Sequence, residues 1–245
     1  MSNAEQPFYR RPLWIVVAIF LAVALVGGGV AVATGVFNGR NDNTAAGPTS
    51  APSSTGSSMP ASAKSVCGLK GYDSTNDLTT APRATWKIIG STATPQSAAA
   101  GPGKTEDDGR FNTCFAHTST GALFASVNYL AASTDSRNSN RLYELLADGD
   151  LKDQLKATPQ PGSDGSDGTR AQVAGFKIDS YSPQETTVDI ALSYTGGTAD
   201  GQLVSLPMVM RWEEGDWKVV ADDNGSPVAP AALSSLGGYI PFSGV

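Results

Sequence analysis

The feature that most constrains this chain is an apolar run at residues 13–37, which contains no charged side chain. A helix rises about 1.5 Å per residue, so a helix of this length exceeds the bilayer's hydrocarbon core, which is about 30 Å thick. Arg10 and Arg11 directly precede the run, and the positive-inside rule then places residues 1–12 in the cytoplasm. We expect a single-pass transmembrane helix at residues 13–37 in the cell membrane, with the rest of the chain outside.

A cleaved secretory signal peptide is the alternative explanation of the same run. Residues 31–33 read Ala-Val-Ala, a small-residue pattern suited to cleavage. The apolar run is, however, about twice as long as the hydrophobic region of such peptides. We therefore favour a retained anchor, and cleavage stays open as the alternative.

Composition divides the remainder of the chain into a linker and a folded domain. Residues 38–64 consist almost wholly of Asn, Thr, Ser, Ala, Gly and Pro, with no aromatic residue. Such a segment has too little apolar surface to offset the entropy of ordering it, so we expect a flexible spacer. Residues 65–245 form the expected extracytoplasmic domain.

The charge balance narrows the range of partners. The chain has a net charge of −6, and from Val66 onward it holds 13 Lys and Arg against 21 Asp and Glu. Direct binding of nucleic acid rests on clustered Lys and Arg, and the sequence has no such cluster. The same acidity argues against adhesion to anionic lipid headgroups. Proteins are therefore the expected partners.

The sequence holds two cysteines, Cys67 and Cys114, and both lie beyond the apolar run. An even pair in an exported domain predicts one structural disulfide. Two alternatives stay open. One is a pair of inert buried thiols, and the other is a reactive or metal-binding thiol at Cys114, three residues before the single histidine, His117.

Hydrophobic periodicity predicts helices in the first half of the domain. A helix capped by Thr118, Ser119 or Thr120 is expected to run to about Ala132. A second helical stretch is expected over residues 140–156, where leucines recur at helical spacing, with an interruption at Gly149.

Alternation of apolar and polar residues predicts antiparallel strands in the second half. Val188 and Ile190 are expected to face the core, with Asp189 between them on the polar face of the strand. The expected strands lie at residues 172–181, 187–194, 204–212 and 217–220, after one short extended segment at 84–91. The order of helices first and antiparallel sheet second predicts an α+β fold class.

The last predicted hairpin carries Trp212, Gly215, Asp216, Trp217, Lys218 and Val219. It resembles the closing hairpin of the nuclear-transport-factor-2-like, or cystatin-like, cone. With an N-terminal anchor, the pattern resembles the inner-membrane scaffold proteins of type IV secretion and conjugation machines. It also resembles actinobacterial membrane proteins that accompany lipid-import complexes. The resemblance implies a cone-shaped domain held outside the membrane on one helix.

A narrower resemblance rests on four stretches, at residues 81–91, 101–103, 108–131 and 238–244. They are similar to an uncharacterised actinobacterial membrane-anchored family associated with integrative and conjugative elements. This resemblance implies a setting in DNA transfer between cells, and it supplies no activity or catalytic residue.

The sequence offers few groups for catalysis. Enzymes of the cone fold hold an Asp or His inside the cavity, whereas His117 lies at a helix entrance and Asp189 on a polar strand face. No G-x-S-x-G motif is present, and one histidine with two paired cysteines is too small a ligand set for zinc. Three adjacent acids at residues 106–108 lack the spacing of a calcium loop and predict a solvated turn. We expect no enzyme activity, no cofactor and no metal.

The expected function is that of a membrane-anchored extracytoplasmic scaffold in a conjugative, type IV secretion-like DNA-transfer apparatus. It would act through protein–protein contacts with other envelope proteins of the complex or with copies of itself. The alternative is an accessory module of a cell-envelope transport complex that binds a lipid or another ligand. The candidate interaction or packing residues are His117, Tyr194, Trp212 and Trp217.

Overall fold

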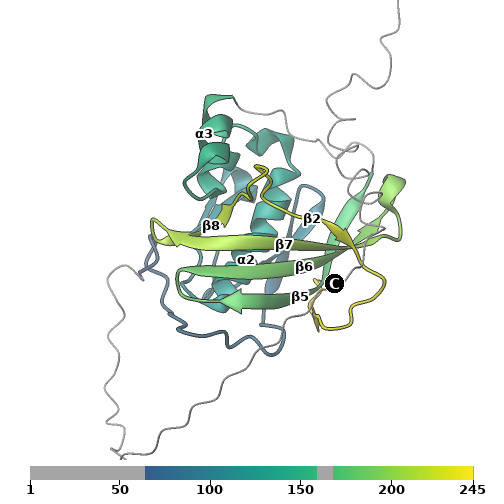
Figure 1. Cartoon of the computed structure of the whole chain (residues 1–245), viewed down its shortest axis with the longest axis horizontal. Coiled ribbons are helices and arrows are strands. Elements are labelled where there is room, and N and C mark those ends of the chain that lie inside the picture. The colour runs from purple at the N-terminus through teal and green to yellow at the C-terminus, as the bar shows by residue number, and fades with distance from the viewer. Residues whose placement is uncertain (1–63, 159–167, 245) are drawn as a thin grey trace, which may run out of the picture. The chain divides into compact units, whose positions relative to one another are not determined.

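The computed structural model describes residues 64–158 and 168–244 (Figure 1). All described residues belong to one compact unit, Met59–Val245. The expected cytoplasmic tail at residues 1–12, the apolar run at 13–37 and the expected linker up to residue 63 lie outside the described residues.

No helix in the described part of the chain is long and apolar enough to cross a membrane. The longest, α2 (Ser119–Ser133), has 15 residues and therefore spans only about 22 Å, less than the hydrocarbon thickness. The structure thus provides no spanning helix for the predicted single-pass membrane location, and that prediction is withdrawn.

A curved, mixed sheet forms the framework of the domain, with strands in the order β1-β2-β5-β6-β7-β8. Neighbours are antiparallel except β2 and β5, which meet in parallel at Thr92 and Ala171. Strands β9 and β10 add to β7 and β5, and β3 and β4 form a separate hairpin. The strands are β1 (Thr85–Ile89), β2 (Thr92–Gln96), β3 (Lys104–Glu106), β4 (Phe111–Thr113), β5 (Arg170–Tyr181), β6 (Glu185–Thr195), β7 (Leu203–Glu213), β8 (Asp216–Val220), β9 (Ala231–Ala232) and β10 (Ile240–Pro241).

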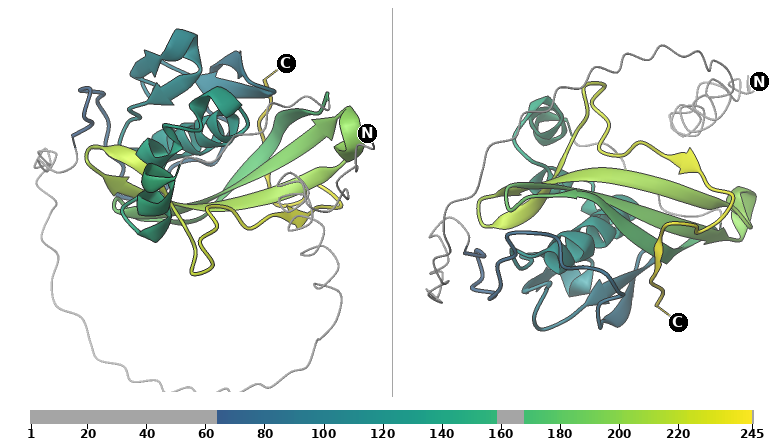
Figure 2. Two further views of the ribbon diagram at one scale, coloured as in Figure 1. Left: turned by 90° about the horizontal axis from the view of Figure 1, so that it is seen from above. Right: turned by 60° about the horizontal axis from the view of Figure 1, so that its bottom comes forward.

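Helix α2 packs between the long strands of the sheet and the short strands that precede it in the chain (Figure 2). Its predicted start is confirmed, because the Thr118 side chain accepts a hydrogen bond from the Gly121 amide at 3.0 Å. All but two of its 15 residues are buried. A helix covered on nearly every side is a core helix, which explains why it is rich in alanine and carries no charge.

The predicted α+β fold class, with helices first and the sheet second, is wrong. The described part is mostly β, and strands β1 to β4 come before α2. The helical stretch predicted over residues 140–156 is interrupted at Gly149, as expected. Its first part forms only a 3-10 turn (Leu142–Leu145), and its second part forms the short helix α3 (Asp150–Ala157). Strand β1 lies within the extended segment predicted at residues 84–91, but β2, β3 and β4 were not predicted, because strands of three to five residues are too short to display a clear period of two.

The long strands β6 and β7 follow the predicted alternation. Val188, Ile190, Leu206, Met208 and Met210 face α2 and are at most 4% exposed. They pack with aromatic side chains from the other layer and from α2 into one core cluster. The inner face of the sheet is therefore filled by side chains.

The C-terminal strap (residues 221–244) crosses the opposite face of the sheet. Strand β9 pairs with β7 and β10 pairs with β5, so the strap runs from one edge of β5-β6-β7 to the other (Figure 2). On the way, the Tyr239 hydroxyl donates to Asp189 at 2.7 Å. Asp189, expected on a polar strand face, is only 3% exposed because the strap covers it.

Beyond β10 the strap inserts Phe242 into the core. Its ring centroid lies 4.7 Å from that of Trp86, 5.6 Å from Phe176 and 6.3 Å from Phe124, and the side chain is 5% exposed. The strap thus contributes an aromatic side chain to the same core that α2 and β5 form.

We predict that Phe242→Ala lowers the free energy of unfolding by about 3–5 kcal/mol, because it removes a buried aromatic ring and leaves a cavity. Chemical denaturation of the full chain measures the change. Ile88→Ala is the control, since Ile88 is 66% exposed and its truncation should change stability by less than about 0.5 kcal/mol. Equal effects of the two substitutions would show that the strap does not belong to the cooperative core.

Candidate functional site

The structure brings three of the predicted candidate residues together in one aromatic corner (Tyr72, His117, Tyr181, Trp212 and Trp217). The His117 ring stacks on Trp212, with centroids 3.8 Å apart and an interplanar angle of 6°. Tyr72 and Trp217 meet the same imidazole edge-on, at 5.1 and 5.5 Å. Tyr181 lies 6.3 Å from Trp217.

The β7–β8 hairpin positions the two tryptophans. Trp212 and Trp217 are directly opposed in the strand register, and only Glu214 and Gly215 lie in the turn between Glu213 and Asp216. Both turn residues have positive φ, 54° and 79°, as a tight hairpin turn with the strand twist requires. A side chain at Gly215 would also approach within 2.8 Å of the Val66 amide nitrogen, so glycine permits the hairpin to lie against the start of the domain.

The His117 side chain is hydrogen-bonded inside the corner. The side chain is 4% exposed, and its Nε2 lies within hydrogen-bond distance of the Pro183 carbonyl oxygen. A carbonyl oxygen only accepts, so Nε2 carries the hydrogen and donates it. His117 therefore links the entrance of α2 to the β5–β6 turn, and Nε2 has no lone pair available to act as a base.

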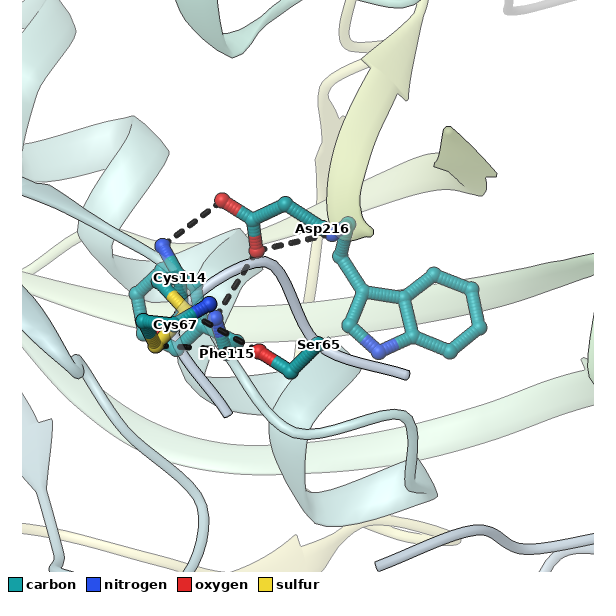
Figure 3. Close-up of a disulfide and its surroundings, with 6 residues drawn as sticks. Ser65, Cys67, Cys114, Phe115 and Asp216 are labelled. Atoms are coloured by element: carbon teal, nitrogen blue, oxygen red, sulfur yellow. Dashed lines mark hydrogen bonds between the residues drawn. A yellow bond between two sulfur atoms is a disulfide. The ribbon is translucent and has the colours of Figure 1, made fainter. Parts of the chain in front are cut away.

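A disulfide and a buried carboxylate lie beside the corner (Figure 3). The predicted bond between Cys67 and Cys114 is confirmed. Asp216 accepts from the amides of Cys114 at 2.7 Å, Phe115 at 2.8 Å and Trp217 at 2.9 Å. The carboxylate thus fixes the start of β8 to the backbone that carries the disulfide.

Burial governs the electrostatics of Asp216, which is 4% exposed. Desolvation raises the pKa of this carboxyl above its ordinary value, and the charge of Lys218 and the three backbone donors act against that rise. Trp217 completes the attachment, since its indole nitrogen donates to the Ala116 carbonyl at 3.0 Å.

We predict that Asp216→Ala lowers the free energy of unfolding by about 3 kcal/mol, because three buried amides lose their acceptor. Urea denaturation followed by tryptophan fluorescence measures both the stability and the environment of Trp217. Asp150→Ala is the matched control, because Asp150 is exposed in the first turn of α3. A loss no larger than that of the control would contradict the anchoring role of Asp216.

The family described as "Domain of unknown function (DUF8175)" matches residues 46–241, which include nearly all of the described structure. The chain belongs to the DUF8175 family. No curated protein and no solved structure matches the chain.

Next to the aromatic corner of the DUF8175 domain, two carboxylates lie at the start of α2. The Ser119 hydroxyl is 3.0 Å from Asp73 and 2.7 Å from Asp77, and the Ser119 amide donates to Asp73 at 2.8 Å. Burial raises the pKa of Asp73, the Ser119 donors lower it, and the neighbouring Asp77 raises it further. Tyr181 joins this group through its hydroxyl, which donates to the Asp73 carbonyl at 3.2 Å.

A raised pKa in the folded state means that the fold binds the Asp73 proton more tightly than the unfolded chain does. The stabilising contribution of this proton is therefore largest at low pH, and it declines as pH rises above the ordinary value of 3.8. We predict that Asp77→Asn lowers the pKa of Asp73 and makes this decline smaller.

An NMR titration of the Asp73 carboxyl carbon tests the first part, and denaturation across about pH 4 to 6 tests the second. Asp150→Asn is the control, since that carboxylate is exposed on α3. An unchanged Asp73 pKa in the Asp77→Asn variant would contradict the coupling.

Tyr194, the fourth candidate, lies away from the corner. It belongs to the end of β6 that pairs with Ala171, whereas the corner adjoins the other end, where the Trp212 amide donates to the Gln184 carbonyl. About 30 Å of strand separates the two ends. Tyr194 packs against the core, and burial raises its pKa.

The solvated turn predicted at residues 106–108 is present, since Asp107–Gly109 form a 3-10 turn in which Asp107 and Asp108 are exposed. Two of the three acids, Glu106 and Asp107, also form ion pairs in the DUF8175 domain. Arg141 binds Glu106 and Asp107, each at 2.8 Å, and its guanidinium lies 4.1 Å from the Phe111 ring centroid. Within residues 64–158 and 168–244, no group of three or more His, Cys, Asp or Glu side chains is arranged to hold a metal ion. The acids therefore attach the β3–β4 hairpin to the segment after α2.

Sequence reasoning missed Tyr72 and Tyr181 as members of the corner. Neither belongs to a motif, and both reach His117 or Trp217 only through the folded arrangement of distant segments. Asp216 had a signal, since the Gly-Asp-Trp sequence of the last hairpin contains it, but the pattern did not indicate which backbone it would bind.

Proposed function

We propose that the DUF8175 domain is a non-enzymatic assembly module that binds another protein through its aromatic corner. The observation that carries the proposal is a group of half-buried aromatic rings, Tyr72, Tyr181 and Trp212, on a support that a disulfide and a buried carboxylate hold in place. Tyrosine and tryptophan on rigid supports are the side chains that most often dominate protein–protein binding energy.

An exposed apolar side chain at the same corner supports the proposal. Val66 is 69% exposed, and its amide donates to the Gly215 carbonyl in the hairpin that carries both tryptophans, at 2.9 Å. An exposed valine attached to the turn of the hairpin that carries Trp212 and Trp217 offers a partner an apolar contact. The disulfide is consistent with an oxidising compartment, where such a partner would be an extracytoplasmic protein.

The two residues considered for catalysis support a non-enzymatic role. His117 uses Nε2 as a donor to Pro183. Asp189 accepts from Ser205 at 2.7 Å and from Tyr239, and it forms an ion pair with Lys177 at 3.3 Å. Both side chains thus connect separate segments of the fold, which favours a structural role for each.

The packing favours assembly over the lipid-carrier alternative. Phe111, Phe124, Phe176, Met208 and Met210 are each under 2% exposed, and they occupy the space around α2 and the inner face of the sheet. A lipid carrier needs that space for its ligand. A place in a conjugative transfer apparatus stays a prediction from the resemblance of the sequence.

We predict that Val66→Asp weakens association with the partner, or with a second copy of the chain, by about tenfold or more, because it adds a charge to an apolar contact. Ile88→Asp is the matched control: Ile88 is 66% exposed, close to the 69% of Val66, but it lies on β1, which is not part of the corner. Both variants keep the buried core intact.

Affinity purification of the full chain from its native cells compares the partner retained by the unchanged chain, Val66→Asp and Ile88→Asp. In separate chains, a photo-crosslinking side chain replaces residue 66 or 88. Specific adducts from position 66 but not from 88, lost in a chain that also carries Trp212→Ala, would support the proposal. Sedimentation of the purified chain separates self-association from binding to another protein. A chain that stays monomeric and forms no adduct at position 66 would overturn the proposal.

A further inference from the structure

A polar hollow of about 470 Å³ lies at the end of the sheet that holds the start of β5, and we name it the β5 hollow (residues 90–91, 134–137 and 168–170). Its three segments are the β1–β2 turn, the residues after α2 and the first residues of β5. The volume falls within the range of about 300–1,000 Å³ that is typical of small-molecule sites. The aromatic corner adjoins the opposite end of the long strands, so the two features are independent.

A buried carboxylate holds one cation of the hollow in place. Asp135, whose side chain is 4% exposed, accepts from Arg137 Nε at 2.7 Å and from Arg137 Nη2 at 2.6 Å. The Arg137 side chain is 59% exposed. A guanidinium has five N–H donors, so the pair leaves three of them for another acceptor. Arg137 also holds the pKa of Asp135 below its ordinary value, which keeps the carboxylate charged.

Arg170 supplies a second cation from a different segment. It is the exposed first residue of β5, and among the residues that the structure describes no ion pair involves it. The residues that line the hollow therefore include two arginines and one aspartate, and the aspartate is already paired with Arg137. This local excess of positive charge stands out on a chain whose net charge is −6.

Small and hydroxyl-bearing residues complete the lining. Ser91, Thr134, Ser136 and Thr169 are among the lining residues, and the Thr134 hydroxyl donates to the Ala131 carbonyl at 2.9 Å. At Gly168 an added Cβ would meet nothing within 4 Å, so the backbone there adjoins open space. Hydroxyls and arginines together suit an anion that accepts several hydrogen bonds, and they do not suit an apolar ligand.

We propose that the β5 hollow binds a small phosphate-bearing molecule through Arg137 and Arg170. A phosphate monoester carries close to two negative charges and three terminal oxygens, so it can accept from both guanidiniums at once, whereas a single carboxylate has one charge and two oxygens. Two cations are too few for a nucleic acid, whose binding depends on many phosphate contacts. The ligand is therefore a small molecule.

Isothermal titration of the full chain with inorganic phosphate, at constant ionic strength, tests the proposal, and acetate serves as the matched carboxylate probe. We expect Arg170→Gln to weaken phosphate binding by about tenfold or more, the loss expected for one charge-assisted contact. Arg83→Gln is the control, because Arg83 is an exposed arginine outside the hollow, and it should leave binding unchanged.

Arg170→Gln is the decisive variant because Arg137→Gln also strands the buried Asp135 carboxylate. Circular dichroism verifies that each variant is folded. Phosphate binding that Arg170→Gln leaves intact, or that Arg83→Gln weakens equally, would overturn the proposal. Acetate that binds as tightly as phosphate would overturn the assignment of a phosphate ligand, and absence of phosphate binding at millimolar concentration would overturn the site itself.

Discussion

The arrangement of the domain depends on the attachment of the β7–β8 hairpin to the backbone around Cys114. Asp216 accepts three amide hydrogen bonds there, two of them from Cys114 and Phe115, and the same stretch is bonded covalently to Cys67. The disulfide joins residues 47 positions apart, which in the chain-entropy account contributes about 4 kcal/mol by restricting the unfolded chain. The hydrogen bonds define where the hairpin lies, and the covalent bond limits how far the start of the domain can move from it.

The other features follow from this attachment. Because the hairpin is fixed to the α2 entrance, Trp212 and Trp217 both contact the His117 ring and each other, and His117 donates a hydrogen bond to the β5–β6 turn. Three connections that are distant in sequence therefore meet at one corner. At the opposite end of the long strands, β2 and β5 pair at one position only, Thr92 with Ala171. The β5 hollow lies next to this short pairing.

Structure could be predicted from the sequence where a strand was long enough to show alternation, or where a residue type itself indicated a helix start or a disulfide. Strands β6 and β7 are 11 residues each, enough for alternation to assign Val188 and Ile190 to the core, and Thr118 marked the start of α2. The presence of two cysteines, both in the domain expected outside the cytoplasm, predicted the disulfide. The order of elements was not predictable, because β1 to β4 are short strands whose pairing is decided by tertiary contacts with α2 rather than by local pattern. Asp189 was predicted to face solvent because the local alternation places it on the polar face of its strand. The segment that covers it, around Tyr239, lies 50 positions later in the sequence and leaves no local pattern at Asp189.

The C-terminal strap has a consequence for how the polypeptide is made. Phe242 fills a place in the core beside Phe124 and Phe176, which belong to segments that a ribosome completes long before it. Until residue 242 has left the exit tunnel, the nascent chain exposes both an unfilled aromatic niche and the Asp189 carboxylate. The core of the domain is thus completed only after residue 242 has emerged, and a chain truncated before Phe242 would expose an apolar gap of the kind that chaperones and quality-control proteases bind.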